Sequence, residues 1–101
     1  MHRERPQRGL RSRIRTLVAD DEPLARELMS NFVRREPGLD LVGTAASGSE
    51  TLAAVEASAP DLLLLDIQMP CLDGISVAEQ LAALERTPYI IFVTAHDSFA
   101  I

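Results

Sequence analysis

Residues 61–66 read Asp-Leu-Leu-Leu-Leu-Asp, a run of four leucines between two acids. A short, fully apolar run bounded by polar residues is typical of a strand that is buried on both faces, although leucine alone is a poor β-former. Sheets are covered on both faces mainly when parallel strands are joined by helices. We therefore expect residues 62–65 to form the central strand of a parallel sheet.

Strand-like and helix-like patterns alternate on either side of this run. Apolar runs predict further strands at residues 14–20, 39–45 and 89–94. Helical periodicity predicts three helices, whose inward stripes are Leu24, Leu28 and Phe32 in the first, Leu52 and Val55 in the second, and Ile75, Ala78, Leu81 and Ala82 in the third. Because crossovers of a dozen or more residues join parallel strands, this order predicts an α/β fold with a doubly wound parallel sheet.

Composition limits the classes of protein to which the chain can belong. The 101 residues suffice for one domain, 47% of them are hydrophobic, and no run of about 20 apolar residues could span a membrane. A single cysteine excludes an internal disulfide, and no apolar stretch follows the basic N-terminus as it would in a secretory signal. We therefore expect a cytoplasmic protein.

The net charge of −5 combines two segments of opposite sign. Residues 1–15 hold six arginines and one glutamate, whereas the remaining residues hold four arginines and fourteen acids. An acidic body argues against nucleic-acid binding by the folded part. The basic arm alone could attract nucleic acid or a membrane, but short Arg-rich termini are more often solvated. We expect a disordered basic arm at residues 1–15 and a folded domain at residues 16–101.

Polar side chains with useful chemistry follow three of the predicted strands. Asp20 and Asp21 end the first strand, Asp66 ends the third and Thr94 ends the fourth. In a parallel sheet these positions share one edge, which is where open α/β sheets bind ligands. If the first and third strands are neighbours, three carboxylates converge, and their repulsion favours a bound cation. Oxygen ligands select a hard cation, and partly hydrated Mg²⁺ fits best.

Each acid also has a purely structural interpretation. Asp21 or Glu22, beside Pro23, could merely start a helix, where acids are favoured by unpaired backbone N–H groups. Asp66 could simply end a strand. The combination favours a site, because chance must otherwise place acids at the ends of two strands and a hydroxyl at the end of a third.

Three stretches of the sequence together resemble the response-regulator receiver domain, which is CheY-like. They are Val-Ala-Asp-Asp-Glu-Pro at residues 18–23, Leu-Asp-Ile-Gln-Met-Pro at residues 65–70 with Asp73-Gly74 following, and Phe-Val-Thr-Ala at residues 92–95. The D-x-x-M-P-x-x-D-G pattern is the specific part of the match. The stretches DDEPLAR and FVTAHDSFAI further resemble receivers that precede LytTR-type DNA-binding domains.

The resemblance implies a flavodoxin-like receiver fold with strand order 2-1-3-4 and a phosphoacceptor role in a two-component system. Asp66 would accept a phosphoryl group from a phosphohistidine of a sensor histidine kinase, and Thr94 would donate its hydroxyl to a phosphoryl oxygen. Asp21 would ligate Mg²⁺ directly and Asp20 mainly through water. The carboxylate of Asp66 and the backbone carbonyl of Gln68 would complete the protein ligands. DNA is expected to bind only a downstream output domain, and the receiver is expected to be neither an enzyme nor a membrane protein.

The chain departs from the family at its C-terminal end. Family members continue with a fourth helix, a fifth strand that ends in Lys-Pro, and a fifth helix, whereas this sequence ends at residue 101 and contains no lysine. The strand at residues 89–94 is then expected to be an exposed apolar edge, which favours self-association. We consider either a truncated regulator or a short natural protein, and we expect a homo-oligomer through that strand.

Two other functions remain open. A receiver-derived dimerisation or binding module would keep the acidic pocket without switching. A phosphoester hydrolase with an aspartyl nucleophile is disfavoured, because such enzymes typically place a second acid two residues after the nucleophile, where this sequence has Gln68.

Overall fold

The computed structural model describes residues 13–67, 69 and 74–93. In chain order they form β1 (Ile14–Ala19), α2 (Pro23–Arg35), β2 (Leu39–Ala45), α3 (Gly48–Ser58), β3 (Leu62–Asp66), α4 (Gly74–Ala82) and β4 (Tyr89–Val93). This alternation agrees with the predicted order of strands and helices. Strand β1 includes Ile14 and Arg15, the last two residues of the range expected for the basic arm. None of the helices within the described ranges has the length and apolar character needed to cross a membrane.

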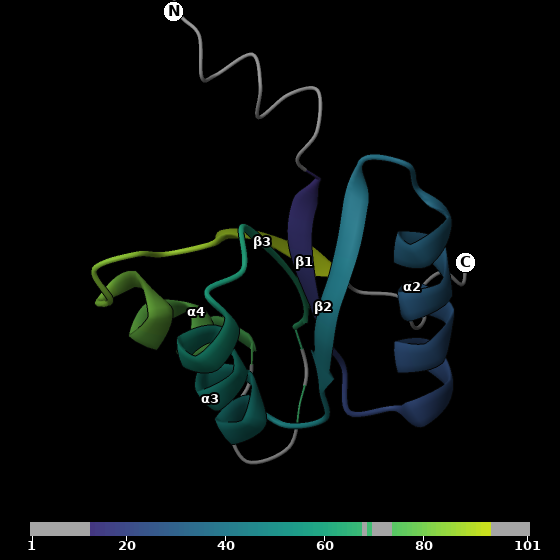
Figure 1. Ribbon diagram of the computed structural model, residues 1–101. Coiled ribbons are helices and arrows are strands. Elements are labelled where there is room, and N and C mark those ends of the chain that lie inside the picture. The colour runs from purple at the N-terminus through teal and green to yellow at the C-terminus, as the bar shows by residue number, and fades with distance from the viewer. Residues whose placement is uncertain (1–12, 68, 70–73, 94–101) are drawn as a thin grey trace, which may run out of the picture.

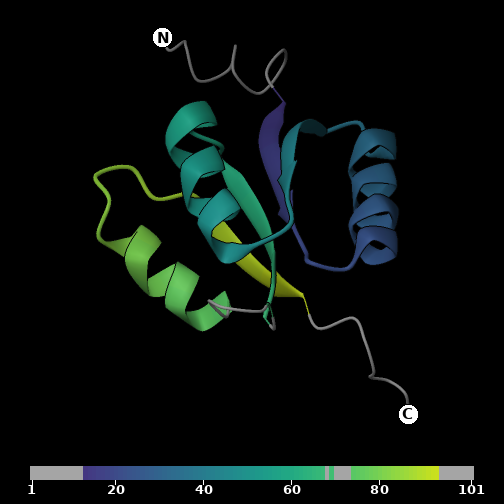
Figure 2. The same cartoon turned by 90° about the horizontal axis from the view of Figure 1, so that it is seen from below.

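The four described strands make one parallel sheet in the order β2-β1-β3-β4. Helix α2 lies on one face of the sheet, and helices α3 and α4 lie on the other (Figure 1, Figure 2). The predicted strand order and the doubly wound arrangement are both confirmed. Strands β1 and β3 are the two inner strands of this sheet, so their carboxyl ends lie side by side.

The leucine run of β3 contributes to the core on both faces of the sheet. Leu63 and Leu65 pack in the hydrophobic cluster on the side of α3 and α4, whereas Leu62 and Leu64 pack in the cluster on the side of α2. All five residues of β3 are buried, as predicted for a central strand. Each fully buried leucine stabilises the fold by about 1.5–3 kcal/mol relative to an exposed one.

Helix α2 buries a different face from the one predicted. The three residues of the expected inward stripe are mainly exposed: Leu24 (69%), Leu28 (62%) and Phe32 (53%). The residues that α2 buries are Ser30 and Val33, so the predicted stripe is wrong. Contacts of α2 with the sheet and with the end of β1 agree with this rotation. Val33 packs in the cluster on this side of the sheet, and the Arg26 guanidinium donates a hydrogen bond to the backbone carbonyl of Asp20.

Helix α4 also differs from the prediction in its buried stripe. Val77 and Leu81, one turn apart, are fully buried, whereas Ile75 and Ala82 are exposed. The prediction is therefore confirmed for Leu81 and wrong for Ile75 and Ala82. Apolar residues occupy several faces of this short helix, so periodicity does not determine which face is buried. In α3 the predicted inward residues do pack against the core, namely Leu52 and Val55.

Both ends of α3 are defined by local contacts. At its N-terminus the Ser47 hydroxyl accepts a hydrogen bond from the backbone N–H of Glu50 at 3.1 Å, as expected of a serine cap. At its C-terminus Ala59 has a φ of 46°, in the left-handed region. The Arg15 guanidinium donates to the carbonyls of Ser58 and Ala59 at 2.6 and 2.8 Å, which ties this end of the helix to β1.

Strand β4 lies at one edge of the described sheet, and β3 is its neighbour. Large apolar side chains of β4 are exposed, namely Tyr89, Ile91 and Phe92. The exposed apolar edge that the sequence predicts is therefore observed at residues 89–93.

Candidate metal centre

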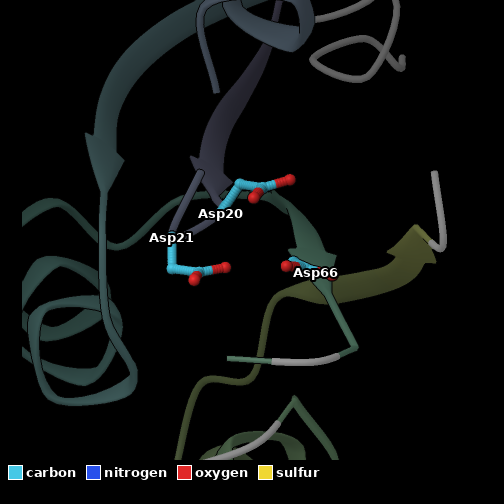
Figure 3. Close-up of side chains that lie close together, drawn as sticks. All are labelled: Asp20, Asp21 and Asp66. Carbon is cyan, nitrogen blue, oxygen red and sulfur yellow. The ribbon is translucent and has the colours of Figure 1, made fainter. Parts of the chain in front are cut away.

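Three carboxylates lie at the carboxyl ends of the two inner strands. Asp20 and Asp21 directly follow β1, and Asp66 is the last residue of β3. Because β1 and β3 are parallel neighbours with Ala19 opposite Leu65, the next residue of each strand lies at the same edge of the sheet. Figure 3 shows the side chains of Asp21 and Asp66 pointing toward one another, with Asp20 beside them.

The predicted convergence of these carboxylates is observed. One carboxylate oxygen from each aspartate lies within 4.8 Å of the other two. Asp20 and Asp66 are almost fully buried, with 2% and 1% of their surface exposed, and Asp21 is half-buried. Two unit charges at this separation repel by about 1 kcal/mol in water and by about 3.5 kcal/mol at an effective dielectric constant of about 20. A bound cation offsets this repulsion.

Hydrogen bonds fix both the backbone and the side chain of Asp20. Its N–H donates to the carbonyl of Ala45 at 3.0 Å, and its Oδ1 accepts the N–H of Glu22 at 3.0 Å. Its backbone carbonyl accepts a hydrogen bond from Nη1 of Arg26 at 2.8 Å. These contacts hold the turn between β1 and α2, which carries Asp20 and Asp21 to the edge of the sheet.

Arg26 contacts this corner, although the sequence patterns assigned it no role. It lies in the first turn of α2, where its N–H donates to the carbonyl of Glu22 at 2.9 Å. A cation is unusual in the first turn of a helix, because the helix dipole favours anions there. That mismatch is the signal from which a contact with the preceding acidic turn could have been inferred.

Two of the predicted site residues, Gln68 and Thr94, lie outside the described residues. Their expected roles as metal ligand and hydroxyl donor stay predictions. The described strands locate the adjoining part of the sheet, where Val93 at the end of β4 lies opposite Asp66 in the parallel register.

The three aspartates offer a ligand set made of oxygen atoms alone. Carboxylate oxygens suit hard divalent cations, and Mg²⁺ is commonly held by one or two carboxylates while it keeps several water molecules. The cluster therefore has the donor chemistry of a magnesium site. Its position at the carboxyl ends of parallel strands is also the position at which open α/β sheets bind ligands.

Residues 16–101 match the family model of the response regulator receiver domain. The chain therefore belongs to this family, the receiver domains of two-component response regulators, as its sequence motifs indicated.

Curated relatives of the chain are regulatory proteins of bacteria. The positive alginate biosynthesis regulatory protein of Pseudomonas aeruginosa is 46% identical over 86 residues, which are 84% of this chain and 35% of that protein. The transcriptional regulatory protein BtsR of Escherichia coli is 42% identical over 88 residues, 87% of this chain and 36% of that protein. The sensory transduction protein LytT of Enterococcus faecalis is 41% identical over 85 residues, 84% and 35% of the two chains. The chain thus spans about a third of the length of these relatives.

Solved structures confirm the receiver fold. The signal receiver domain of the response regulator NarL from Mycobacterium tuberculosis superposes with a TM-score of 0.78 at 34% identity, over 87% of this chain and 71% of that one. A chain of the CheX-CheY-BeF3-Mg²⁺ complex from Borrelia burgdorferi superposes with a TM-score of 0.74 at 25% identity, over 81% of this chain and 62% of that one.

Proposed function

We propose that this chain is the phosphoacceptor module of a two-component signalling system, in which Asp66 takes a phosphoryl group from a histidine kinase while Asp20 and Asp21 hold Mg²⁺. The observation that carries the proposal is the meeting of three carboxylates within 4.8 Å at the ends of β1 and β3. By the family motif, the carbonyl of Gln68 is a further ligand, and the hydroxyl of Thr94 donates to a phosphoryl oxygen.

The proposed transfer needs little beyond positioning and neutralised charge. A carboxylate oxygen of Asp66 forms a bond to phosphorus while the bond between phosphorus and the imidazole nitrogen of the kinase breaks. The electron pair of the broken bond stays on that nitrogen, and the product on this chain is an acyl phosphate. Bound Mg²⁺ supplies neutralisation of the phosphoryl oxygens. Asp20 and Asp66 are buried and Asp21 is the most exposed of the three, so the incoming group approaches past Asp21.

A solved relative supports the choice of cation. The Borrelia burgdorferi complex contains Mg²⁺ and BeF3 together with CheX and CheY. A chain of that complex shares the fold of this protein. The oxygen ligands of Asp20, Asp21 and Asp66 suit the same ion.

The proposed partners follow from the family and from the relatives. The phosphoryl donor is a sensor histidine kinase, and this chain acts in the cytoplasm. Relatives about three times as long include a transcriptional regulatory protein. We therefore assign DNA binding to a downstream output domain of the kind found in LytTR-type regulators, and not to the acidic receiver.

Association without phosphorylation is the second candidate function, and strand β4 is the observation that favours it. Tyr89, Ile91 and Phe92 expose apolar surface on an edge strand. Unpaired edge strands with apolar faces readily pair with another chain. We propose that a second copy of this chain associates through the edge of β4.

Exposure to acetyl phosphate and MgCl2, followed by intact-mass measurement, separates the two functions. A phosphoacceptor gains a phosphoryl group, and the gain disappears in Asp66→Ala and in the presence of EDTA. The matched control is Asp40→Ala, because Asp40 is exposed on β2 and its loss removes the same charge. No mass gain in the wild-type protein, or an equal gain in Asp66→Ala, would overturn the phosphoacceptor proposal and leave the association function.

A further inference from the structure

The turn that carries Asp20 and Asp21 is held by one side chain from outside the acidic cluster. Backbone groups make two of the three contacts of Asp20, namely the carbonyl of Ala45 and the N–H of Glu22. The third contact is the hydrogen bond from Nη1 of Arg26 to the Asp20 carbonyl, 2.8 Å long and partly buried. A substitution of Arg26 removes this hydrogen bond and leaves the aspartates of the cluster unchanged.

The position of Arg26 couples the start of α2 to the end of β1. The N–H of Arg26 donates to the Glu22 carbonyl at 2.9 Å, and the N–H of Glu22 donates to Oδ1 of Asp20 at 3.0 Å. Together with the hydrogen bond from the Arg26 guanidinium to the Asp20 carbonyl, these contacts form a closed ring of hydrogen bonds through Asp20, Glu22 and Arg26. Because side chains of a helix lean toward its N-terminus, a long side chain at this position reaches the preceding turn without strain.

Arg26 also lines a groove of about 220 Å³ between α2 and β2, together with Ser30, Arg34 and Thr44. The guanidinium group is planar and keeps its donors in a fixed arrangement, so it fixes the direction of a hydrogen bond better than a flexible ammonium group does.

We propose that Arg26 is a positioning residue of the metal centre, which fixes the Asp20 backbone so that the carboxylates of Asp20 and Asp21 face Asp66. The inference rests on the proposed function, because its purpose is to order ligands for Mg²⁺. Partners that orient metal ligands without touching the metal typically change metal affinity by about 10- to 100-fold when they are removed. Arg26 bonds the backbone of a ligand, and not its carboxylate, so we expect the lower end of that range.

The test compares three variants in which an arginine of α2 is replaced by an unbranched side chain. Arg26→Met keeps the apolar stem and removes the donors, and Arg26→Lys keeps one charged donor. Arg34→Met is the matched control, because Arg34 lines the same groove two turns further along α2 but donates to Asn31 and not to the acidic turn. Isothermal titration with MgCl2 gives the affinity. Exchange of the Glu22 amide hydrogen, measured by NMR without metal, gives the order of the turn.

The expected result is that Arg26→Met raises the Kd for Mg²⁺ about 10-fold and speeds exchange of the Glu22 amide. Arg26→Lys falls between Arg26→Met and wild type, and Arg34→Met equals wild type. Equal Mg²⁺ affinity in Arg26→Met and wild type, or an equal loss in Arg34→Met, overturns the inference. If Arg26→Met does not fold, the comparison of Arg26→Lys with Arg34→Lys decides in the same way.

Failure of the proposed function gives a different pattern. Wild-type protein that binds no Mg²⁺ contradicts the metal centre itself, whatever the variants do. The exchange rate of the Glu22 amide hydrogen then still shows whether Arg26 orders the turn. An unchanged exchange rate in Arg26→Met also overturns the proposed ordering of the turn by Arg26.

Discussion

Replacing Asp66 by asparagine is expected to stabilise the metal-free protein and to abolish its stabilisation by Mg²⁺. Asp66 takes part in two of the three carboxylate pairs within 4.8 Å. Taken at its lower limit, the value in water of about 1 kcal/mol for each pair, the repulsion that the substitution relieves is about 2 kcal/mol. The substitution also weakens the interactions that the Asp66 carboxylate makes with its surroundings, at a cost of about 1 kcal/mol. The net gain is about 1 kcal/mol, or about 4–8 °C in Tm for a domain of this size.

Thermal unfolding followed by circular dichroism measures both effects, in EDTA and in MgCl2. Wild-type protein gains about 1.4 kcal/mol when free Mg²⁺ is about ten times its Kd, by mass action. Asp66→Asn is expected to gain far less. The control is Asp40→Asn, which removes one exposed charge from β2 and leaves the cluster intact. The reasoning is refuted if Asp66→Asn is no more stable than Asp40→Asn in EDTA, or if it keeps the full response to Mg²⁺.

Three further substitutions test other parts of the structure. Ala59→Gly is expected to raise the free energy of unfolding in urea by about 1 kcal/mol, because Ala59 has a φ of 46°; an unchanged midpoint would contradict the strain. Ser47→Ala removes the hydroxyl that accepts the Glu50 N–H and should lower the same free energy by about 1 kcal/mol; no loss would argue against the cap. Ile91→Lys on the exposed face of β4 should convert a dimer to a monomer in sedimentation velocity; a monomeric wild-type protein would refute association through β4.

The central strand could be predicted because all its leucine positions are apolar, whichever face of the sheet each side chain occupies. Every residue from Leu62 to Leu65 is apolar, so either face of β3 finds a hydrophobic cluster. The strand–helix alternation then required a parallel sheet. Because β1 and β3 are neighbours, the acids at their carboxyl ends lie at one edge of the sheet. Asp20, Asp21 and Asp66 could therefore be placed together from the sequence alone.

The orientation of the helices could not be predicted in the same way. In α2 the regular spacing of Leu24, Leu28 and Phe32 predicted a buried stripe, yet these residues are exposed. Periodicity measures spacing along one helix, whereas rotation depends on contacts with the sheet. Here Val33 and Met29 pack against the sheet, and Arg26 donates a hydrogen bond to a backbone carbonyl just after β1. Any residue can supply a backbone carbonyl, so the unusual cation in the first turn of α2 indicates a contact but not its acceptor.

The location of a divalent ion tests the central claim most directly. Mn²⁺ shares with Mg²⁺ a preference for oxygen ligands and scatters anomalously, so crystals soaked in MnCl2 reveal its position. We expect an anomalous peak between the carboxylates of Asp20, Asp21 and Asp66, and loss of that peak in Asp66→Asn. An ion bound elsewhere on the domain, or an empty corner at saturating Mn²⁺, would contradict the central claim.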